Sequence, residues 1–98
     1  MAKTYYTDYV NHLMWTYVNH DGLDKPLGVR QQRAVEKALM GLTKAEKHAI
    51  LEIYKRRDTF EDNVYQVSKK YNIHQNKLWM MLNYVSKNIA KELGLIYE

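Results

Sequence analysis

The chain has no cysteine, one proline and four glycines among its 98 residues. Without cysteine, disulfide bonds and thiolate metal sites are excluded, and nothing in the composition argues for export to an oxidising compartment. Asp8, Asn11 and His12 interrupt the apolar core that an N-terminal signal peptide would need. No uninterrupted apolar run is long enough to cross a bilayer. We therefore expect a cytoplasmic protein with no membrane partner.

Catalytic and metal-binding motifs are also missing. The histidines are scattered along the chain, at His12, His20, His48 and His74. There is no glycine-rich phosphate loop, no nucleophile elbow and no pair of carboxylates framed by a pocket-forming architecture. We expect no metal, no cofactor and no catalytic residue, and hence a protein that is not an enzyme.

Helical periodicity is what the chain does contain, since no stretch alternates apolar and polar residues long enough to argue for a strand. Hydrophobic residues make up 46% of the chain, which is enough for one small core. We expect a compact all-α single domain of five helices spanning residues 1–98. The expected helices cover about 4–20, 29–40, a segment starting at 43, a segment from the turn at 58–59 to about 71, and about 75–93.

Caps and apolar stripes support these boundaries. Thr43 and Glu46 have capping-box spacing, Thr59 with Asp62, or Asp62 alone, can cap the fourth helix, and glycines 41 and 94 are expected helix stops. The residues expected on the buried sides are Tyr6, Tyr9, Val10, Leu13, Met14, Tyr17, Val18, Ala34, Val35, Ala38, Leu39, Ala49, Ile50, Ile53, Tyr54, Val64, Val67, Ser68, Tyr71, Leu78, Met81, Leu82, Val85, Ile89 and Leu93.

The segment 21–28 (DGLDKPLG) is the only linker-like stretch, because it concentrates glycine and proline. It divides an aromatic N-terminal helix and linker, residues 1–28, from a module of residues 29–98. Trp15 falls nearly opposite the apolar stripe of the first helix. It is either a lone surface aromatic or a contact for a partner.

The formal net charge of +4 favours a polyanionic partner. The excess centres on residues 41–57, where five Lys or Arg residues face two Asp or Glu residues. A solvated helix face with a basic last turn explains the same pattern without any partner.

Residues Val64 to Asn83 have the pattern of a helix-turn-helix. Ser68 is the small residue where the helices cross, and Asn72 is in the turn position that needs a positive φ. Ile73 anchors the turn and Leu78 anchors the second helix. Any two amphipathic helices joined by a short turn would produce a similar pattern, so the agreement of several positions carries the prediction.

A family resemblance rests on the run from Leu42, LTKAEKHAILEIYKRRDTFEDNVYQVSKKYNIHQNKLWMMLNYVSKNIAKELG. This run resembles the region-4 DNA-binding module of bacterial sigma factors. It looks most like the small phage transcription regulators of Gram-positive bacteria, of the ArpU and RinA type. The shared features are a Leu-Thr-x-x-Glu opening, a tyrosine closing the third helix, the helix-turn-helix, and a long last helix ending in basic residues and glycine.

The resemblance implies a sequence-specific DNA-binding transcription regulator of phage or prophage origin in the cytoplasm of a bacterial host. The helix starting near Gln75 would enter the major groove of double-stranded DNA. The residues nominated for base contact are His74, Gln75, Asn76, Met80 and Asn83. The residues nominated for phosphate contact are Lys55, Arg56, Arg57, Lys69, Lys70, Lys87 and Lys91.

Trp79 and Met80 depart from this pattern, because DNA-reading helices usually carry polar side chains there. Trp79 either completes the core, for example against the first helix, or belongs to a protein-binding surface with Trp15 and Tyr84. The alternative function is therefore a protein-binding adaptor on a helix-turn-helix scaffold, targeting RNA polymerase or a host defence protein. Host RNA polymerase and a second copy of the chain are the candidate protein partners.

Overall fold

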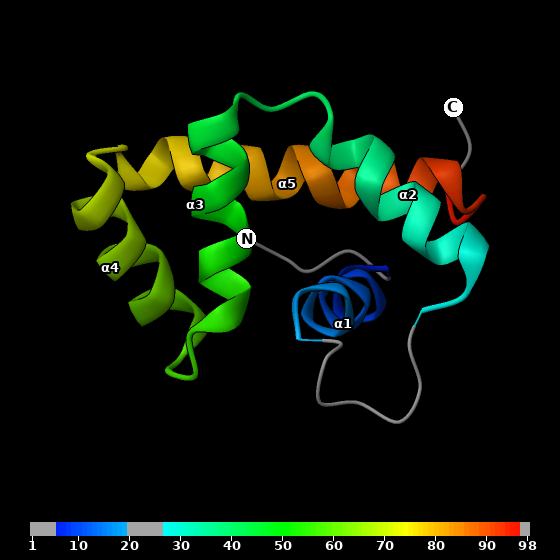
Figure 1. Cartoon of the computed structure of the whole chain (residues 1–98), viewed down its shortest axis with the longest axis horizontal. Helices are drawn as coiled ribbons and strands as arrows, with labels where there is room; N and C mark the ends of the chain where they lie inside the picture. The colour runs from blue at the N-terminus through cyan, green and yellow to red at the C-terminus, as the bar shows by residue number, and fades with distance from the viewer. Residues whose placement is uncertain (1–5, 20–26, 97–98) are drawn as a thin grey trace.

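The computed structural model describes residues 6–19 and 27–96, and every regular element within them is an α-helix (Figure 1). The helices are α1 (Thr7–Val18), α2 (Val29–Leu39), α3 (Lys44–Lys55), α4 (Phe60–Tyr71) and α5 (Gln75–Glu92). The expected all-α single domain is confirmed. The expected linker at 21–28 lies mostly outside the described residues, as do the ends of the expected first helix and the last two residues.

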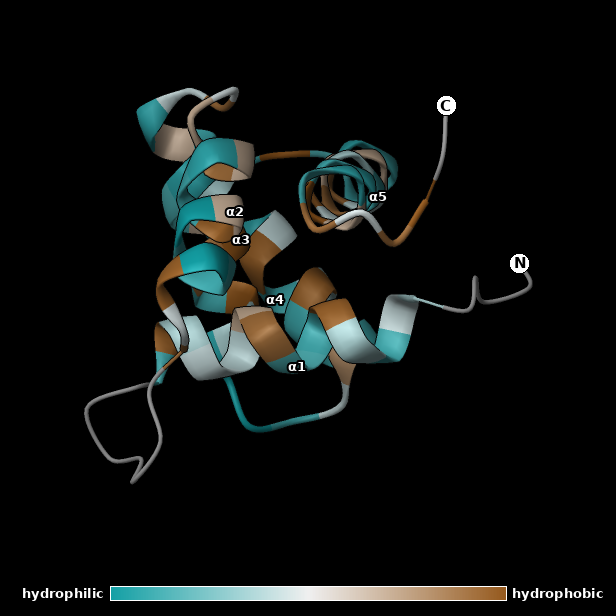
Figure 2. Ribbon diagram, turned by 90° about the vertical axis from the view of Figure 1, so that its right-hand side faces the viewer, coloured by the Kyte–Doolittle hydropathy of each residue, from teal (hydrophilic) through white to brown (hydrophobic). Residues whose placement is uncertain are grey.

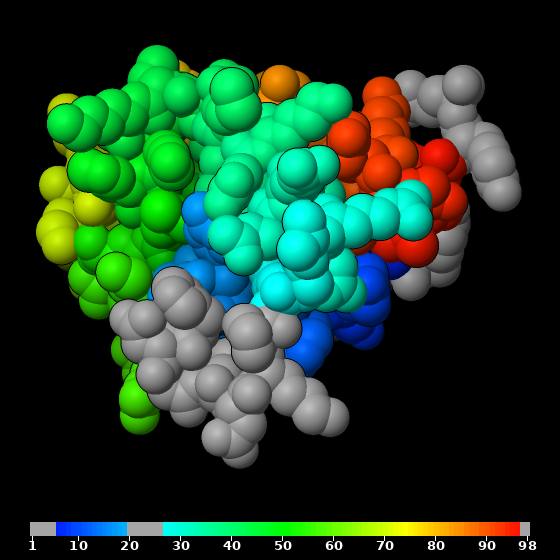
Figure 3. Space-filling view, turned by 45° about the vertical axis from the view of Figure 1, so that its right-hand side comes forward, coloured from blue at the N-terminus to red at the C-terminus, as the bar shows by residue number. Residues whose placement is uncertain are grey.

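The longest helix, α5, lies along one side of the other four. Figure 2 looks along its axis and shows the remaining helices to one side of it. Its C-terminal half packs against α2, and Figure 3 shows these two segments side by side on the surface, with α1 below them. Its N-terminal half packs against α4, which itself packs against α3. One side of α5 is therefore left facing outward.

One hydrophobic core joins all five helices. Its buried residues are Val10, Leu13, Met14, Ala34, Val35, Ala38, Leu39, Ala49, Ile50, Ile53, Tyr54, Val64, Val67, Leu78, Met81, Leu82, Val85, Ile89 and Ala90. Nearly all were expected from the 3.6-residue periodicity. Leu95 and Ile96 also pack against the core, so the described part of the tail folds back onto it.

Some residues of the expected stripes are less buried than predicted. Tyr9 is 43% exposed, and its hydroxyl accepts a hydrogen bond from Gln31 Nε2 at 2.9 Å. A tyrosine ring can cover apolar surface while its hydroxyl stays at the surface, so the stripe overstates its burial. Ser68 and Tyr71 are half-buried, whereas Thr16, which the stripe omits, is buried.

The predicted N-caps are confirmed. Thr43 Oγ1 accepts from the Glu46 amide at 3.2 Å, and Glu46 Oε1 accepts from the Thr43 amide at 2.9 Å. Thr59 Oγ1 accepts from the Asp62 amide at 3.3 Å. These side chains satisfy amides that have no partner within their helices.

The two expected glycine stops have different outcomes. Gly94 has φ +74°, as a left-handed C-terminal glycine should. Gly41 follows Met40, the C-cap of α2, so the helix does end beside it, but it is not among the positive-φ glycines of the described residues. A Cβ on Gly41 would lie 2.7 Å from the Tyr84 hydroxyl, so a larger residue here would require the half-exposed Tyr84 side chain to shift.

Candidate nucleic-acid interface

The turn between α4 and α5 has the backbone geometry that the sequence predicts. Asn72 is left-handed, with φ 54° and ψ 45°, and is the only non-glycine residue with positive φ among those described. The amide of Ile73 donates to the Ser68 carbonyl at 3.1 Å, and Ser68 Oγ donates to the Ile73 carbonyl at 2.6 Å. Ser68 therefore ties the turn through its hydroxyl, a role that its small size alone does not reveal.

The first nominated residue, His74, is the N-cap of α5. Its Nδ1 accepts a hydrogen bond from the Asn76 amide at 3.1 Å. A histidine nitrogen that accepts a hydrogen bond carries no proton, so Nε2 is the nitrogen left for an external contact. The side chain thus begins the helix and is also exposed beside its first turn.

The nominated base-contact residues are all exposed, His74 at the N-cap and the other four on the first half of α5. Asn76, Met80 and Asn83 follow one another at spacings of four and three residues, and Lys87 continues the series after four more. Such spacings place side chains on one side of a helix, and here it is the side opposite the buried Leu78 and Val85. Gln75 is exposed but lies about 100° around the helix from Asn76.

Trp79 is half-buried and packs against the core. Its ring lies 5.7 Å from the ring of Phe60, which in turn lies 5.5 Å from the ring of Tyr54. The predicted core role is confirmed, but the ring it packs on is in α4 and not in the first helix. Phe60 had no role in the sequence-based interpretation.

The remaining aromatic and apolar candidates do not join Trp79 in one exposed patch. Met80 is 71% exposed on the outer side of α5, whereas Tyr84 is 50% exposed and approaches Gly41 after α2. Trp15 is 45% exposed on α1. Its predicted position away from the core stripe is confirmed.

The nominated phosphate-contact residues form three groups. Lys55, Arg56 and Arg57 lie at the end of α3, Lys69 and Lys70 in the last turn of α4, and Lys87 and Lys91 in the second half of α5. The Lys69 ammonium lies 4.9 Å from the ring centroid of Tyr65, a cation–π distance. The nominated cations therefore lie near both ends of α4 and along the second half of α5.

Glu52 on α3 is the residue that the sequence-based interpretation missed. Its carboxylate accepts from Arg56 Nη2 at 2.9 Å, Lys70 Nζ at 2.7 Å and Tyr71 Oη at 3.1 Å. Burial alone would raise its pKa, but the hydrogen bonds from Lys70, Arg56 and Tyr71 outweigh burial, so the pKa lies below its ordinary value. One carboxylate thus offsets two of the nominated cations.

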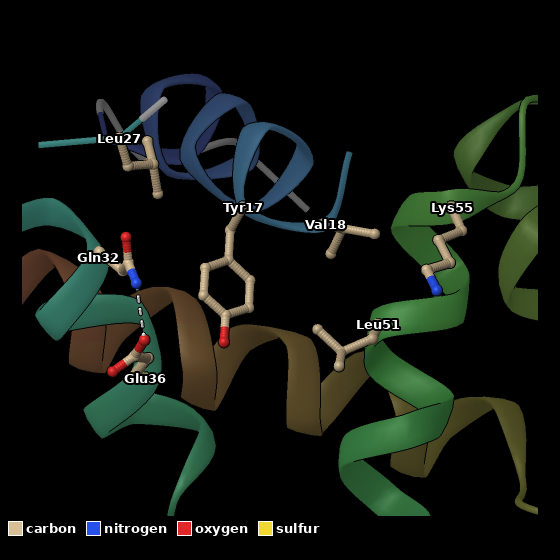
Figure 4. A pocket seen from close by; sticks show the side chains of 7 residues that line it. All are labelled: Tyr17, Val18, Leu27, Gln32, Glu36, Leu51 and Lys55. Carbon is tan, nitrogen blue, oxygen red and sulfur yellow. Dashed lines mark hydrogen bonds between the residues drawn. The ribbon is translucent and has the colours of Figure 1, made fainter. Parts of the chain in front are cut away.

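A separate pocket of about 300 Å³ lies between α1, α2 and α3 (Figure 4). Tyr17 points into it from α1, with Glu36 and Gln32 at one side and Leu51 at the other. Burial, and then the charge of Glu36, raise the pKa of Tyr17. Apart from Lys55, the pocket includes none of the nominated residues, so it is distinct from the outer side of α5.

The described residues form neither a candidate metal site nor a candidate membrane span. No group of three or more His, Asp or Glu side chains within 6–19 and 27–96 could hold a metal ion. Among the same residues, no helix is both long enough and apolar enough to span a membrane.

Comparison of the chain with protein-family models, with curated proteins and with solved structures found no match.

Proposed function

We propose that the chain is a sequence-specific DNA-binding transcription regulator whose α4–α5 pair acts as a helix-turn-helix. The observation that carries the proposal is the outer side of α5, where Asn76, Asn83 and Lys87 are exposed in one row. An asparagine side chain can form paired hydrogen bonds with adenine, and a lysine can pair with phosphate. The proposed origin in a phage or prophage, and the location in a bacterial cytoplasm, rest on the resemblance to phage regulators.

The dimensions of α5 suit this use. Asn76 and Asn83 are seven residues apart, which is about 10 Å along a helix axis. That distance corresponds to roughly three base pairs of duplex DNA. The inward contact of Trp79 with Phe60 supports the proposal as well, because it leaves polar side chains on most of the outer side.

Other proposed phosphate contacts lie at the two ends of α4. Lys69 is in its last turn, and Arg57 is three residues before its first residue, Phe60. Arg56 and Lys70 must exchange part of their pairing with Glu52 for a phosphate oxygen, so we expect them to contribute less than Arg57 and Lys69.

Selection of binding sites from random duplex DNA tests the proposal. The full chain should enrich one short sequence, and a second copy of the chain on a palindromic site would give half-sites one or more helical turns apart. Affinity for the enriched site should fall steeply with salt. The logarithmic slope should weaken by about 0.9 for each phosphate contact removed, as in Lys69→Ala. No enrichment together with no binding at low salt would contradict the proposal.

A second candidate function is a protein-binding adaptor that targets RNA polymerase or a host defence protein. The observation that favours it is the exposure of Met80, at 71%, and of Tyr84, at 50%, on the helix that would otherwise read DNA. Large exposed apolar side chains are common in protein interfaces. Tyr84→Ala separates the two candidates, since an adaptor would lose its partner whereas selection of a DNA site would persist.

A further inference from the structure

A groove of about 870 Å³ lies between α1 and the corner where α3 leads into α4. Trp15 and Val18 line it from α1, Lys55 and Arg57 from the end of α3, and Phe60 from the first turn of α4. It joins α1 to the consecutive helices α3 and α4, which begin more than 20 residues later in the sequence. The proposed DNA-reading side of α5 takes no part in it.

Hydrogen bonds hold the walls of this groove together. The Asn19 side chain donates to the Tyr54 carbonyl at 3.3 Å, and the Tyr54 hydroxyl donates to Asn11 Oδ1 at 2.9 Å, which fixes α1 to α3. The Asn63 side chain donates to the carbonyls of Ile53 at 3.1 Å and Arg56 at 3.0 Å, which fixes α4 to α3. A groove held this way is formed before any ligand arrives, so little ordering free energy is lost on binding.

The groove offers an aromatic side chain, Trp15, that the hydrophobic core does not use. Trp15 is 45% exposed at its edge, while the opposite side of α1 supplies Val10, Leu13 and Met14 to the core. Phe60 and Tyr54, whose rings meet at 62°, form an aromatic floor. A single hydrophobic side chain from a partner would find rings on two sides here.

The rim is positively charged. Lys55 and Arg57 are exposed, and among the described residues Asp58 is the only acidic one that lines the groove. Arg56 also lines the groove, but its guanidinium pairs with the Glu52 carboxylate at 2.9 Å. Glu52 does not line the groove. Such a rim favours a ligand that carries carboxylates close to its hydrophobic group.

We propose that this groove binds an extended polypeptide segment of a partner protein in which acidic side chains flank one aromatic or leucine anchor. The anchor packs between Trp15 and Phe60, and the flanking carboxylates pair with Lys55 and Arg57.

A nucleic acid strand fits this groove less well. Grooves that bind single strands place several aromatic rings along a continuous row of cations, and here one exposed ring lies beside two cations. Lys55 and Arg57 are also proposed phosphate contacts, so a bound segment would weaken duplex binding. The weakening of duplex binding rests on the proposed function, whereas peptide binding in the groove does not depend on it.

Fluorescence of Trp15 tests the proposal directly. The chain contains two tryptophans, so Trp79→Phe leaves Trp15 as the only indole. The probe is a short synthetic peptide with one Phe flanked by Asp and Glu, and it should shift the Trp15 emission to shorter wavelength as the ring is covered. Anisotropy of the same peptide, labelled, gives its affinity for the unmodified chain without relying on that variant.

Variants locate the site. Trp15→Ala and Arg57→Glu should each weaken peptide binding at least about tenfold, since the first removes one of the rings that hold the anchor and the second places a like charge against the carboxylates of the peptide. Lys47→Glu, an equal charge change at an exposed position of α3 outside the groove, should leave affinity within about twofold. Circular dichroism confirms that each variant is folded.

Four results would overturn the proposal: no emission shift with the acidic peptide, equal binding of the same peptide with Lys in place of its acids, tighter binding of a single-stranded DNA oligomer, or unchanged affinity in Arg57→Glu. Each is independent of whether α5 selects a duplex site. Failure of the groove and failure of the proposed DNA-binding function are therefore distinguishable.

Discussion

The indole ring of Trp79 on α5 lies against the phenyl ring of Phe60, the first residue of α4, with centroids 5.7 Å apart and planes tilted by 48°. This contact joins the beginning of α4 to the second turn of α5. Because Trp79 turns toward α4, its neighbours Met80 and Asn76 are left on the outer side of α5. The contact between Trp79 and Phe60 buries part of both rings against the core. It also determines which side of α5 is available to a partner.

Replacing Trp79 should therefore cost stability, whereas replacing Trp15 should not. For Trp79→Ala we expect a loss of about 2 to 4 kcal/mol, near the lower part of the range for large-to-small changes of aromatic residues, because the ring is only half-buried. Trp15→Ala, an equal change at a ring 45% exposed, should cost less than about 1 kcal/mol. Urea unfolding followed by circular dichroism measures both, and equal losses would contradict the assignment of Trp79 to the core.

The left-handed backbone conformation of Asn72 leads to a second prediction. Asn72→Gly should be nearly neutral, since glycine adopts φ 54° without steric cost, whereas Asn72→Ala should lose about 1 kcal/mol. Both variants remove the side chain amide, so their difference isolates the backbone. Equal unfolding free energies for the two variants would show that the turn is not held in this conformation.

This turn was predictable because its determinants are local. Asparagine is one of the few residues that tolerates the left-handed region, and its place between two amphipathic segments leaves few alternatives. The capping pair Thr43 and Glu46 was predictable for the same reason, being three residues apart. The periodic burial of Leu78 and Val85 follows from helix geometry.

The contacts that shape the surface were not predictable, because they join distant segments. Glu52 and Lys70 are 18 positions apart, and nothing in either helix marks the other as its partner. Phe60 and Trp79 are on different helices, so the sequence showed only that Trp79 flanks its own apolar stripe. Gly41 had a local explanation as a helix stop, but nothing local indicates its close approach to the Tyr84 hydroxyl, 43 residues away.

A third prediction concerns Asn63, which is 4% exposed and donates to the carbonyls of Ile53 and Arg56. Asn63→Asp replaces the donor with a carboxylate oxygen facing two carbonyls, so we expect a loss of about 3 kcal/mol or more at neutral pH. Gln66→Glu makes the same amide-to-acid change at an exposed position of α4 and should cost less than about 0.5 kcal/mol. If Asn63→Asp unfolds at the same urea concentration as Gln66→Glu, Asn63 does not hold α4 to α3.

A fourth prediction uses the lowered pKa of Glu52. A carboxyl whose pKa is lower in the folded state contributes stability above the ordinary glutamate pKa of about 4.3, and that contribution is lost as the pH falls through the lowered pKa. Glu52→Gln cannot ionise, so the unmodified chain should be more stable than this variant by about 1 kcal/mol at pH 7. The difference should shrink as the pH falls below about 4.

Urea titrations at neutral and acidic pH measure this difference. Glu61→Gln removes the same charge from an exposed residue of α4 that forms no ion pair in the set around Glu52 and serves as the control. A stability difference for Glu52→Gln that stays constant with pH would rule out the ionised carboxylate as its cause.

The proposed function depends most on Asn76, so its effect on DNA specificity is the most direct test. Affinities of the unmodified chain, Asn76→Ala and Gln32→Ala should be measured for the duplex enriched by selection and for an unrelated duplex at the same low salt. Gln32 is an exposed amide on α2 and serves as the matched control. The account predicts that Asn76→Ala loses about tenfold or more in affinity for the selected site, since a bidentate asparagine–adenine contact is worth about 1 to 3 kcal/mol. It predicts unchanged affinity for the unrelated duplex, and no effect of Gln32→Ala on either. If Asn76→Ala binds the selected duplex as tightly as the unmodified chain does, the outer side of α5 does not read DNA through this residue and the central claim is contradicted.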